Sequence, residues 1–354
     1  MDLPIRPPVS PMLAKLAREI PQGEFLYEPK WDGLRCMAFR SDQEVDLRSR
    51  NQRPLARYFP ELVEGLRSLP NERFILDGEV VLFTSRGADF GSLLLRLHPS
   101  GSRVARLRQE TPASFVAFDL LAVGGTDLRS RSFAKRRRQL EEVLLGCDAP
   151  VFITPITDDR DVATSWLEAF QGSGVDGVVA KQANMPYQPG KRAMVKVKRE
   201  RTADCVVAGF RWLVDRPEVG SLLLGLYDGH GELRHVGVAS SFTKTRRAEL
   251  LEELSPLIVP IEGHRWERGF GLERSPVGRL AGAAARWSPE EMDLDWIPVR
   301  PEKVCEVAYD QLDDGRFRHP ARFIRWRPDR EPVSCTYEQL ETLSHGLEDI
   351  LSLA

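Results

Sequence analysis

The chain has 354 residues, of which 42% are hydrophobic and 29% are charged, and its net charge is −2. This length suits two domains that each bury a core, and the composition is ordinary for a globular protein in water. The near-neutral charge excludes a basic excess spread over the whole chain, so any binding of nucleic acid has to come from local patches.

The apolar runs, the N-terminus and the cysteines exclude two further classes. No apolar run approaches the roughly 18 residues of a membrane helix, and Met1 to Pro4 lack the basic and apolar regions of a signal peptide. We therefore expect a cytoplasmic protein with no membrane partner. The five cysteines lie far apart, without Cys-x-x-Cys spacing, which favours reduced thiols over a zinc site.

The first 200 residues alternate strand and helix patterns after a proline-rich lead-in. An apolar run at residues 25–27 leads into Lys30, and two alternating runs behind it form a predicted hairpin. We expect helices over 12–18, 60–69, 92–108, 133–145 and 161–171, and strands over 34–40, 44–50, 74–83, 113–123, 151–156, 177–181 and 194–198.

The pattern changes near residues 199–203, where we place a domain boundary. Five short strands and one helix follow, which is typical of a small closed sheet such as an OB-fold. We expect these strands over 205–212, 221–227, 233–239, 304–309 and 321–327, and the helix over 244–257.

Two basic clusters stand out. The first, Lys135 to Arg138, opens the helix expected over 133–145 and predicts a solvated helix face. The second gathers six arginines between Arg316 and Arg330, interleaved with aromatic residues. A salt-bridged strand face and a phosphate-binding surface explain this second cluster equally well.

Lys30 is followed by Asp32-Gly33, a strong turn pair. An exposed lysine has a pKa of about 10.4 and is protonated at neutral pH, so a nucleophilic lysine has to be desolvated or placed beside other cations. For this short motif alone, a solvated lysine in a hairpin turn is the simpler interpretation.

Six motifs in a fixed order change that interpretation, because their joint agreement by chance is improbable. They are Lys30-Trp-Asp-Gly33, Asp77-Gly-Glu79, Phe115-Val-Ala-Phe-Asp119, Asp176-Gly-Val-Val-Ala-Lys181, Val195-Lys-Val-Lys198 and Arg325-Trp-Arg-Pro-Asp-Arg330. On these residues the chain resembles the ATP-dependent DNA ligases of the covalent nucleotidyltransferase superfamily, and most closely the actinobacterial ligase C type. The resemblance covers nearly the whole chain.

The resemblance implies an α+β fold. Residues 1–200 would form an adenylation (nucleotidyltransferase) domain of antiparallel sheets with flanking helices, and residues 201–354 a small OB-fold β-barrel. It also implies an activity, the sealing of breaks in duplex DNA. The reaction would proceed through a lysyl-AMP intermediate on Lys30, transfer of AMP to a 5′-phosphate and attack by a 3′-OH. ATP and Mg²⁺ or Mn²⁺ are the implied cofactors.

The resemblance also assigns binding residues. The adenine amino group would be taken up beside Glu28, and Phe118 would stack on the base. Lys196 and Lys198 lie two apart on a strand and so share a face, which the resemblance places at the α-phosphate, where their charge would depress the pKa of Lys30. The remaining expected ligand contacts come from Arg35, Arg50, Glu79, Arg192, Arg325 and Arg327.

Glu79 and Asp176 are the expected metal ligands, since Mg²⁺ needs few carboxylates when phosphate oxygens are present. Asp176 departs from the glutamate that the family usually has, and Arg330 stands where many relatives have lysine. Arg325 and Arg327 are expected to serve adenylation through a hinge near residues 198–202 that closes the second domain on ATP and then moves it onto DNA.

Nicked duplex DNA and ATP are the expected partners of a monomer, with repair proteins as further candidates. Two alternatives remain open at this point. The first is another covalent nucleotidyltransferase, either an RNA ligase or an mRNA capping guanylyltransferase. The second is a non-catalytic OB-fold protein that binds nucleic acid.

Overall fold

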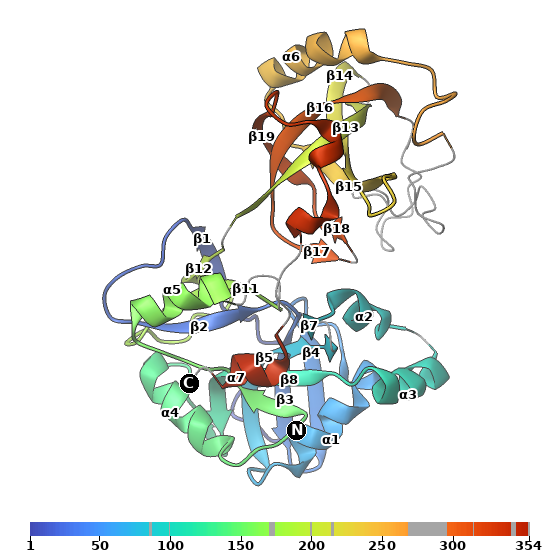
Figure 1. Ribbon diagram of the computed structural model, residues 1–354. Coiled ribbons are helices and arrows are strands. Elements are labelled where there is room, and N and C mark those ends of the chain that lie inside the picture. The colour runs from blue at the N-terminus through green and yellow to red at the C-terminus, as the bar shows by residue number, and fades with distance from the viewer. Residues whose placement is uncertain are drawn as a thin grey trace. The chain divides into compact units, whose positions relative to one another are not determined.

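The computed structural model describes residues 1–84, 87–98, 100–169, 174–198, 200–213, 216–267, 296–313, 315–340 and 345–352 (Figure 1). The chain divides into two compact units, residues 1–199 with 342–354 and residues 200–341. Each unit has its own apolar core.

The first unit contains two large sheets with helices packed on them (Figure 1). Its strand pairs are antiparallel except β1 with β12 and β10 with β8, which are parallel. The four-stranded sheet has the order β1 (Leu13–Ala17), β12 (Arg192–Val197), β11 (Val175–Gln182) and β2 (Phe25–Trp31). The six-stranded sheet has the order β10 (Val151–Ile153), β8 (Ser114–Val123), β5 (Arg73–Val81), β3 (Leu34–Ser41) and β4 (Glu44–Ser49), with β9 (Thr126–Asp127) on β8.

The remaining elements of this unit are short. Strands β6 (Phe83–Thr84) and β7 (Gly87–Ala88) pair with each other. The helices are η1 (Ala56–Tyr58), α1 (Pro60–Ser68), α2 (Phe90–Leu95), α3 (Gly101–Glu110), α4 (Phe133–Val143), α5 (Arg160–Ala169) and α7 (Leu347–Leu351).

Side chains alternate between the two faces of the four-stranded sheet, as strand geometry requires. One face is apolar and is covered by α5, which contributes Ala163 and Trp166. The opposite face carries the charged side chains that alternate with the apolar ones, together with Val179 and Met194. The sheet residues of the apolar face are Tyr27, Trp31, Val175, Val178, Ala180, Val195 and Val197.

Two expected helices are corrected. Residues 12–18 contain β1, because their backbone pairs with the edge of β12, where Leu13 lies opposite Arg192 and Leu16 opposite Lys196. The helix expected over 92–108 is two helices, α2 and α3, which lie on either side of Pro99 in the sequence. Proline cannot continue a helix, because it lacks the backbone N–H and clashes with the preceding turn.

The basic start of α4 is only in part the solvated face that was expected, because Lys135 and Arg138 are exposed but the two arginines between them are buried. Arg136 is fully buried, and its Nε and Nη2 donate to the carboxylate of Asp119 at 2.7 and 2.9 Å. Arg137 is also buried, and its Nη2 donates to the carbonyl oxygen of Thr154 at 2.8 Å. The two central arginines of this cluster are therefore buried, because buried acceptors compensate for the cost of removing their charges from water.

The second unit is a closed five-stranded barrel with the strand order β13, β14, β15, β19 and β16. The only parallel pair among these barrel strands joins β15 to β19. Helix α6 (Lys244–Leu254) buries Leu250 and Leu254 against it. The barrel strands are β13 (Arg201–Leu213), β14 (Arg216–Tyr227), β15 (Leu233–Ser240), β16 (Ile297–Tyr309) and β19 (Ala321–Trp326), and the short elements are η2 (Ser255–Leu257), β17 (Leu312–Asp313), β18 (Arg316–Phe317), η4 (Pro332–Ser334) and η5 (Tyr337–Leu340).

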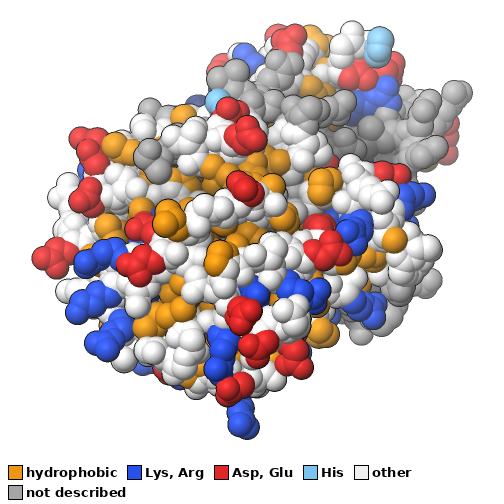
Figure 2. Space-filling view, turned by 90° about the horizontal axis from the view of Figure 1, so that it is seen from below, with side chains coloured by type: hydrophobic (Ala, Val, Ile, Leu, Met, Phe, Trp, Pro, Cys, Tyr) orange, Lys and Arg blue, Asp and Glu red, His pale blue; other side chains and the backbone are white. Residues whose placement is uncertain are grey.

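The surface and the thiols agree with the composition. On the face shown in Figure 2, acidic, basic and apolar side chains of the described residues are mixed. All five cysteines are free thiols, and four of them are buried. Within the described ranges, no helix is long and apolar enough to cross a membrane.

The chain returns to the first unit after the barrel. The second domain was expected to reach residue 354, whereas residues 342–354 belong to the first unit. Ile350 of α7 is fully buried in the same apolar cluster as Tyr27 and Trp31. The backbone N–H of Gly346 donates to the carboxylate of Asp349 and completes the start of the helix. Apolar burial therefore determines where this segment lies.

Ile350→Ala should destabilise the first unit by roughly 2–4 kcal/mol, because it leaves a cavity in a closed core. Hydrogen exchange of the β2 and β11 amides would locate the loss in this unit. Leu145→Ala, at a side chain that is 83% exposed, is the control and should change little. Unchanged protection of β2 and β11 in Ile350→Ala would contradict this account of α7.

Candidate functional site

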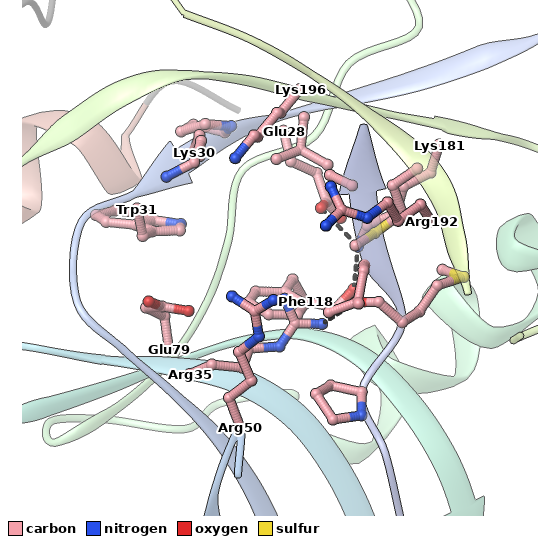
Figure 3. Close-up of a pocket in the computed structure, with 17 residues that line it drawn as sticks. Glu28, Lys30, Trp31, Arg35, Arg50, Glu79, Phe118, Lys181, Arg192 and Lys196 are labelled. Carbon is pink, nitrogen blue, oxygen red and sulfur yellow. Dashed lines mark hydrogen bonds and ion pairs between the residues drawn. The ribbon is translucent and has the colours of Figure 1, made fainter. Parts of the chain in front are cut away.

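A pocket of about 400 Å³ opens on the polar face of the four-stranded sheet (Figure 3). A pocket of this size can hold a nucleotide-sized ligand. Its walls come from both sheets of the first unit and from the lead-in before β1. The lining residues are Pro11, Met12, Leu13, Ala14, Glu28, Pro29, Lys30, Trp31, Arg35, Arg50, Glu79, Phe118, Val179, Lys181, Arg192, Met194 and Lys196.

Lys30 lies near the end of β2, and the Asp32-Gly33 turn carries the chain from the four-stranded sheet into β3 of the other sheet. A Cβ on Gly33 would lie 2.1 Å from the carbonyl oxygen of Val80. A Cβ on Gly177 would likewise lie 2.1 Å from the carbonyl oxygen of Val197. Both motif glycines are therefore required by close backbone approach, which brings the Lys30 and Asp176 segments against their neighbours.

Asp176 holds two lysines at once. Its Oδ1 lies 2.6 Å from Nζ of Lys30, and its Oδ2 lies 2.7 Å from Nζ of Lys198. The Asp176 side chain is only 8% exposed, so water screens these contacts weakly. This short aspartate thus reaches both lysines directly.

The pKa of Lys30 is raised, which corrects the expectation that Lys196 and Lys198 depress it. Burial acts to lower the pKa of Lys30, but the carboxylate of Asp176, together with the charges of Glu79 and Asp32, outweighs burial. The pKa of Lys196 is lowered by burial and by the positive charges of Lys30 and Lys198. The ammonium form of Lys30 is thus favoured as long as Asp176 keeps its negative charge.

The opposite end of the pocket is built from a buried ion pair and an aromatic ring. Glu28 Oε2 lies 2.7 Å from Nζ of Lys181, and both side chains are at most 3% exposed. Nζ of Lys181 also donates to the carbonyl oxygen of Phe118 at 3.2 Å and lies 4.7 Å from the centre of the Phe118 ring. Burial raises the pKa of Glu28, and the positive charge of Lys181 opposes that rise.

Arginines line the wall between these two ends (Figure 3). Arg35 donates from Nε and Nη2 to the two oxygens of Asp77 at 2.6 and 2.7 Å, and its guanidinium lies 4.4 Å from the centre of the Phe118 ring. This fork holds the charge of Arg35 at a fixed position, and the carboxylate raises its pKa. Arg50 and Arg192 add two further guanidinium groups suited to phosphate.

Glu79 and Asp176 fit a divalent cation by their oxygen chemistry. Burial raises the pKa of Glu79 to about 7, while Arg35 and Lys30 act to lower it, so this carboxylate can change charge near neutral pH. In the part of the chain that the structure describes, no three His, Cys, Asp or Glu side chains could hold a metal ion together. A cation would therefore need phosphate oxygens and water as further ligands, as Mg²⁺ commonly does.

Arg325 and Arg327 lie outside this pocket, in the second unit. Nε of Arg325 donates to Glu306 at 2.7 Å, and the Arg325 side chain is 61% exposed. Arg327 is held more firmly, because Nη1 donates to both oxygens of Asp204 at 3.0 Å and Nε and Nη2 donate to Asp329. Local carboxylates thus neutralise both arginines within the barrel.

Sequence reasoning gave no role to Lys181, Asp77, Tyr187 or Trp31. Lys181 carried a usable signal, because it lies two residues after Val179 on β11 and so shares the pocket face. Asp77 and Tyr187 carried none, since their contact at 2.6 Å joins positions 110 residues apart. Trp31 lines the pocket and donates from Nε1 to Thr154 at 2.8 Å.

Comparison with known proteins identifies the family. The ATP dependent DNA ligase domain matches residues 11–198, and the ATP dependent DNA ligase C terminal region matches residues 215–330. DNA ligase C2 of Mycolicibacterium smegmatis is 49% identical over 98% of both chains, and DNA ligase C of Mycobacterium tuberculosis is 47% identical over 99% of both. A solved Lig E DNA ligase has a similar fold, with a TM-score of 0.54 and 18% identity over 90% of this chain and 99% of that one.

These similarities confirm the resemblance drawn from the motifs, including its ligase C type, and give no support to a capping enzyme, an RNA ligase or a non-catalytic binding protein. ATP is the nucleotide of this family, and DNA is its substrate. The chain belongs to the ATP-dependent DNA ligases, enzymes that join breaks in DNA at the expense of ATP.

Proposed function

We propose that Lys30 is the nucleophile of this ligase. Its amine would attack the α-phosphorus of ATP, forming a P–N bond as the bond to pyrophosphate breaks, and AMP would then pass to the 5′-phosphate of a nick for displacement by the 3′-OH. The observation that carries this proposal is the contact of Lys30 with Asp176 in a pocket that Lys196 also lines. Lys196 and Lys198 would stabilise the charge that develops on the α-phosphate.

The same contact would control when Lys30 loses its proton. The carboxylate of Asp176 contributes most to keeping the pKa of Lys30 high, so neutralising it would let burial and Lys196 lower that pKa against the weaker pull of Glu79 and Asp32. Glu79 and Asp176 are the proposed ligands of Mg²⁺ or Mn²⁺, which when bound would supply positive charge to the phosphate oxygens. If Asp176 shared its negative charge with a bound cation, it would hold the ammonium of Lys30 less strongly, and the pKa of Lys30 would fall.

The base would lie at the end of the pocket formed by Glu28, Lys181 and Phe118. The backbone beside Glu28 would accept the adenine amino group, and Phe118 would contribute stacking, worth about 1–3 kcal/mol for a base on an aromatic ring. Oε1 of Glu28 is buried with no hydrogen-bond partner among the described residues, which suits an acceptor that a donor group of the ligand would satisfy. Arg35, Arg50 and Arg192 would contact the ribose and the phosphates.

The barrel would supply cations for the first step. We propose that it is an OB-fold domain that follows an adenylation domain ending near residue 200. Arg325 and Arg327 would act on the β- and γ-phosphates of ATP during adenylation, and a hinge near residues 198–202 would then free the barrel for DNA. Arg199 within this hinge lies outside the described residues.

The cellular setting is part of the same proposal. We propose a monomer that works in the cytoplasm on nicked duplex DNA during repair, with repair proteins as partners. Contacts with DNA phosphates would make its grip on the duplex salt-dependent.

Lys30→Ala should abolish self-adenylation, because it removes the amine that would form the P–N bond. It should retain sealing of a nick that already carries AMP. Self-adenylation is measured with labelled ATP on a denaturing gel, and sealing is measured with a pre-adenylated nicked duplex. Lys135→Ala, at an exposed lysine, is the control. A covalent AMP on the Lys30→Ala protein would refute the assignment.

Glu79→Gln should slow adenylation and alter its metal dependence, yet stabilise the fold above neutral pH. The folded pKa of Glu79, about 7, lies above the ordinary 4.5. The stability it contributes is therefore full below about pH 4.5 and is lost as the pH rises through 7. A glutamine avoids that loss, on the order of 1–3 kcal/mol at pH 8.

Urea unfolding in chelator at pH 5 and pH 8 measures this difference. Glu142→Gln removes an exposed carboxylate from α4 and should leave the stability unchanged at both pH values. If the stability of Glu79→Gln relative to the unchanged protein is no higher at pH 8 than at pH 5, Glu79 is not a desolvated acid.

Arg325→Ala combined with Arg327→Ala should block adenylation by ATP and preserve most sealing of a pre-adenylated nick, because these cations are needed only while pyrophosphate leaves. Point variants are preferable to a chain cut near residue 200, which would also remove α7. The matched control is Arg234→Ala with Arg300→Ala, at two barrel arginines paired with Asp228 and Glu302. Equal losses in both assays would make Arg325 and Arg327 ordinary DNA contacts.

A further inference from the structure

Asp77 is a fully buried carboxylate that holds more than Arg35. Its Oδ2 accepts a hydrogen bond from Nη2 of Arg35 at 2.7 Å and a second one from the hydroxyl of Tyr187 at 2.6 Å. Burial and the charge of Asp77 raise the pKa of Tyr187 far above its ordinary value, so the phenol stays a donor. Two groups remote in sequence, the guanidinium of Arg35 and the hydroxyl of Tyr187, therefore share one carboxylate.

The hydroxyl of Tyr187 also connects this carboxylate to the wall of the pocket. It accepts the backbone N–H of Met12 at 2.9 Å, while Nη2 of Arg35 donates to the carbonyl oxygen of Met12 at 3.3 Å. The peptide groups on both sides of Met12 are thus tied to Tyr187 and to Arg35. Since Met12 and Arg35 both line the pocket, the lead-in is a fixed wall of the nucleotide site.

The ring of Tyr187 is fixed by a second buried ion pair. The guanidinium of Arg136, paired with Asp119, lies 5.6 Å from the centre of the Tyr187 ring. Nη1 of Arg136 donates to the carbonyl oxygen of Met185 at 3.1 Å, and the backbone N–H of Tyr187 donates to the carbonyl oxygen of Arg129 at 2.8 Å. Tyr187 is 4% exposed, so its phenol has little freedom to leave Asp77.

We propose that Tyr187 is a positioning residue for ATP binding, which holds Asp77 and thereby sets Arg35 and the Met12 wall in the orientation that the nucleotide meets. The proposal rests on the role given to Arg35 under the proposed function. Two nitrogens of Arg35 are committed to Asp77, so a shift of Asp77 turns the whole guanidinium. Tyr187 itself would not touch the reacting atoms.

The test is Tyr187→Phe, which removes only the hydroxyl. We expect the KM for ATP in self-adenylation to rise roughly tenfold, because a buried hydrogen bond to a carboxylate is lost and the N–H of Met12 loses its acceptor. The adenylation rate at saturating ATP should stay within about twofold, since Lys30 and Asp176 are not disturbed.

The matched control is Tyr27→Phe. Tyr27 is equally buried, and its hydroxyl donates to the carbonyl oxygen of Pro21 at 2.8 Å, away from Asp77. The two variants should lose similar thermal stability, while only Tyr187→Phe raises the KM for ATP. Equal KM values in the two variants would overturn the proposal.

A double variant tests whether Tyr187 acts through Arg35. Arg35→Lys should itself raise the KM for ATP, and adding Tyr187→Phe should raise it little further, because the two changes disable one unit. Fully multiplicative effects would overturn the proposal. An unchanged KM in Arg35→Lys would refute the role of Arg35 together with this inference, whereas an effect of Arg35→Lys without one of Tyr187→Phe would refute this inference alone.

Discussion

The contact of Asp176 with Lys30 and Lys198 is the constraint on which the rest of the site depends. Three like-charged lysines converge on one face of a sheet, and only a carboxylate among them makes their burial tolerable. Two close backbone approaches, at Gly33 and Gly177, bring the strands near enough for this pairing. The same charge that stabilises the folded site also keeps its amine protonated.

Two further buried pairs continue this design away from Lys30. Glu28 with Lys181 closes one end of the pocket, and Asp119 with Arg136 underlies the loop of Tyr187. Each pair satisfies charges that the chain has taken out of water, and each fixes the orientation of its neighbours more than it adds stability. The pocket is therefore shaped by buried electrostatics as well as by apolar packing, which lies on both faces of the four-stranded sheet.

Much of this arrangement could be predicted from the sequence. Alternation over residues 194–198 placed Lys196 and Lys198 on one face, and the family resemblance placed Glu28, Lys30, Glu79 and Phe118 at one site. Of these, only Lys198, which follows the end of β12, is absent from the pocket lining. The predictions that were wrong depended on contacts with residues distant in the sequence. The strand β1 needed the open edge of β12, the burial of Arg136 needed Asp119, and the pKa of Lys30 needed the balance between burial and Asp176. None of these is visible in a local pattern.

The return of the chain to the first unit has a consequence for how the protein is made. Ile350 completes the apolar cluster behind β2, but it is synthesised after every residue of the barrel. During translation the strand that carries Lys30 therefore exists for some time with part of its apolar covering missing, although domains generally fold as they emerge. The first unit is thus the first to begin to emerge and the last to be completed, with the barrel inserted within it.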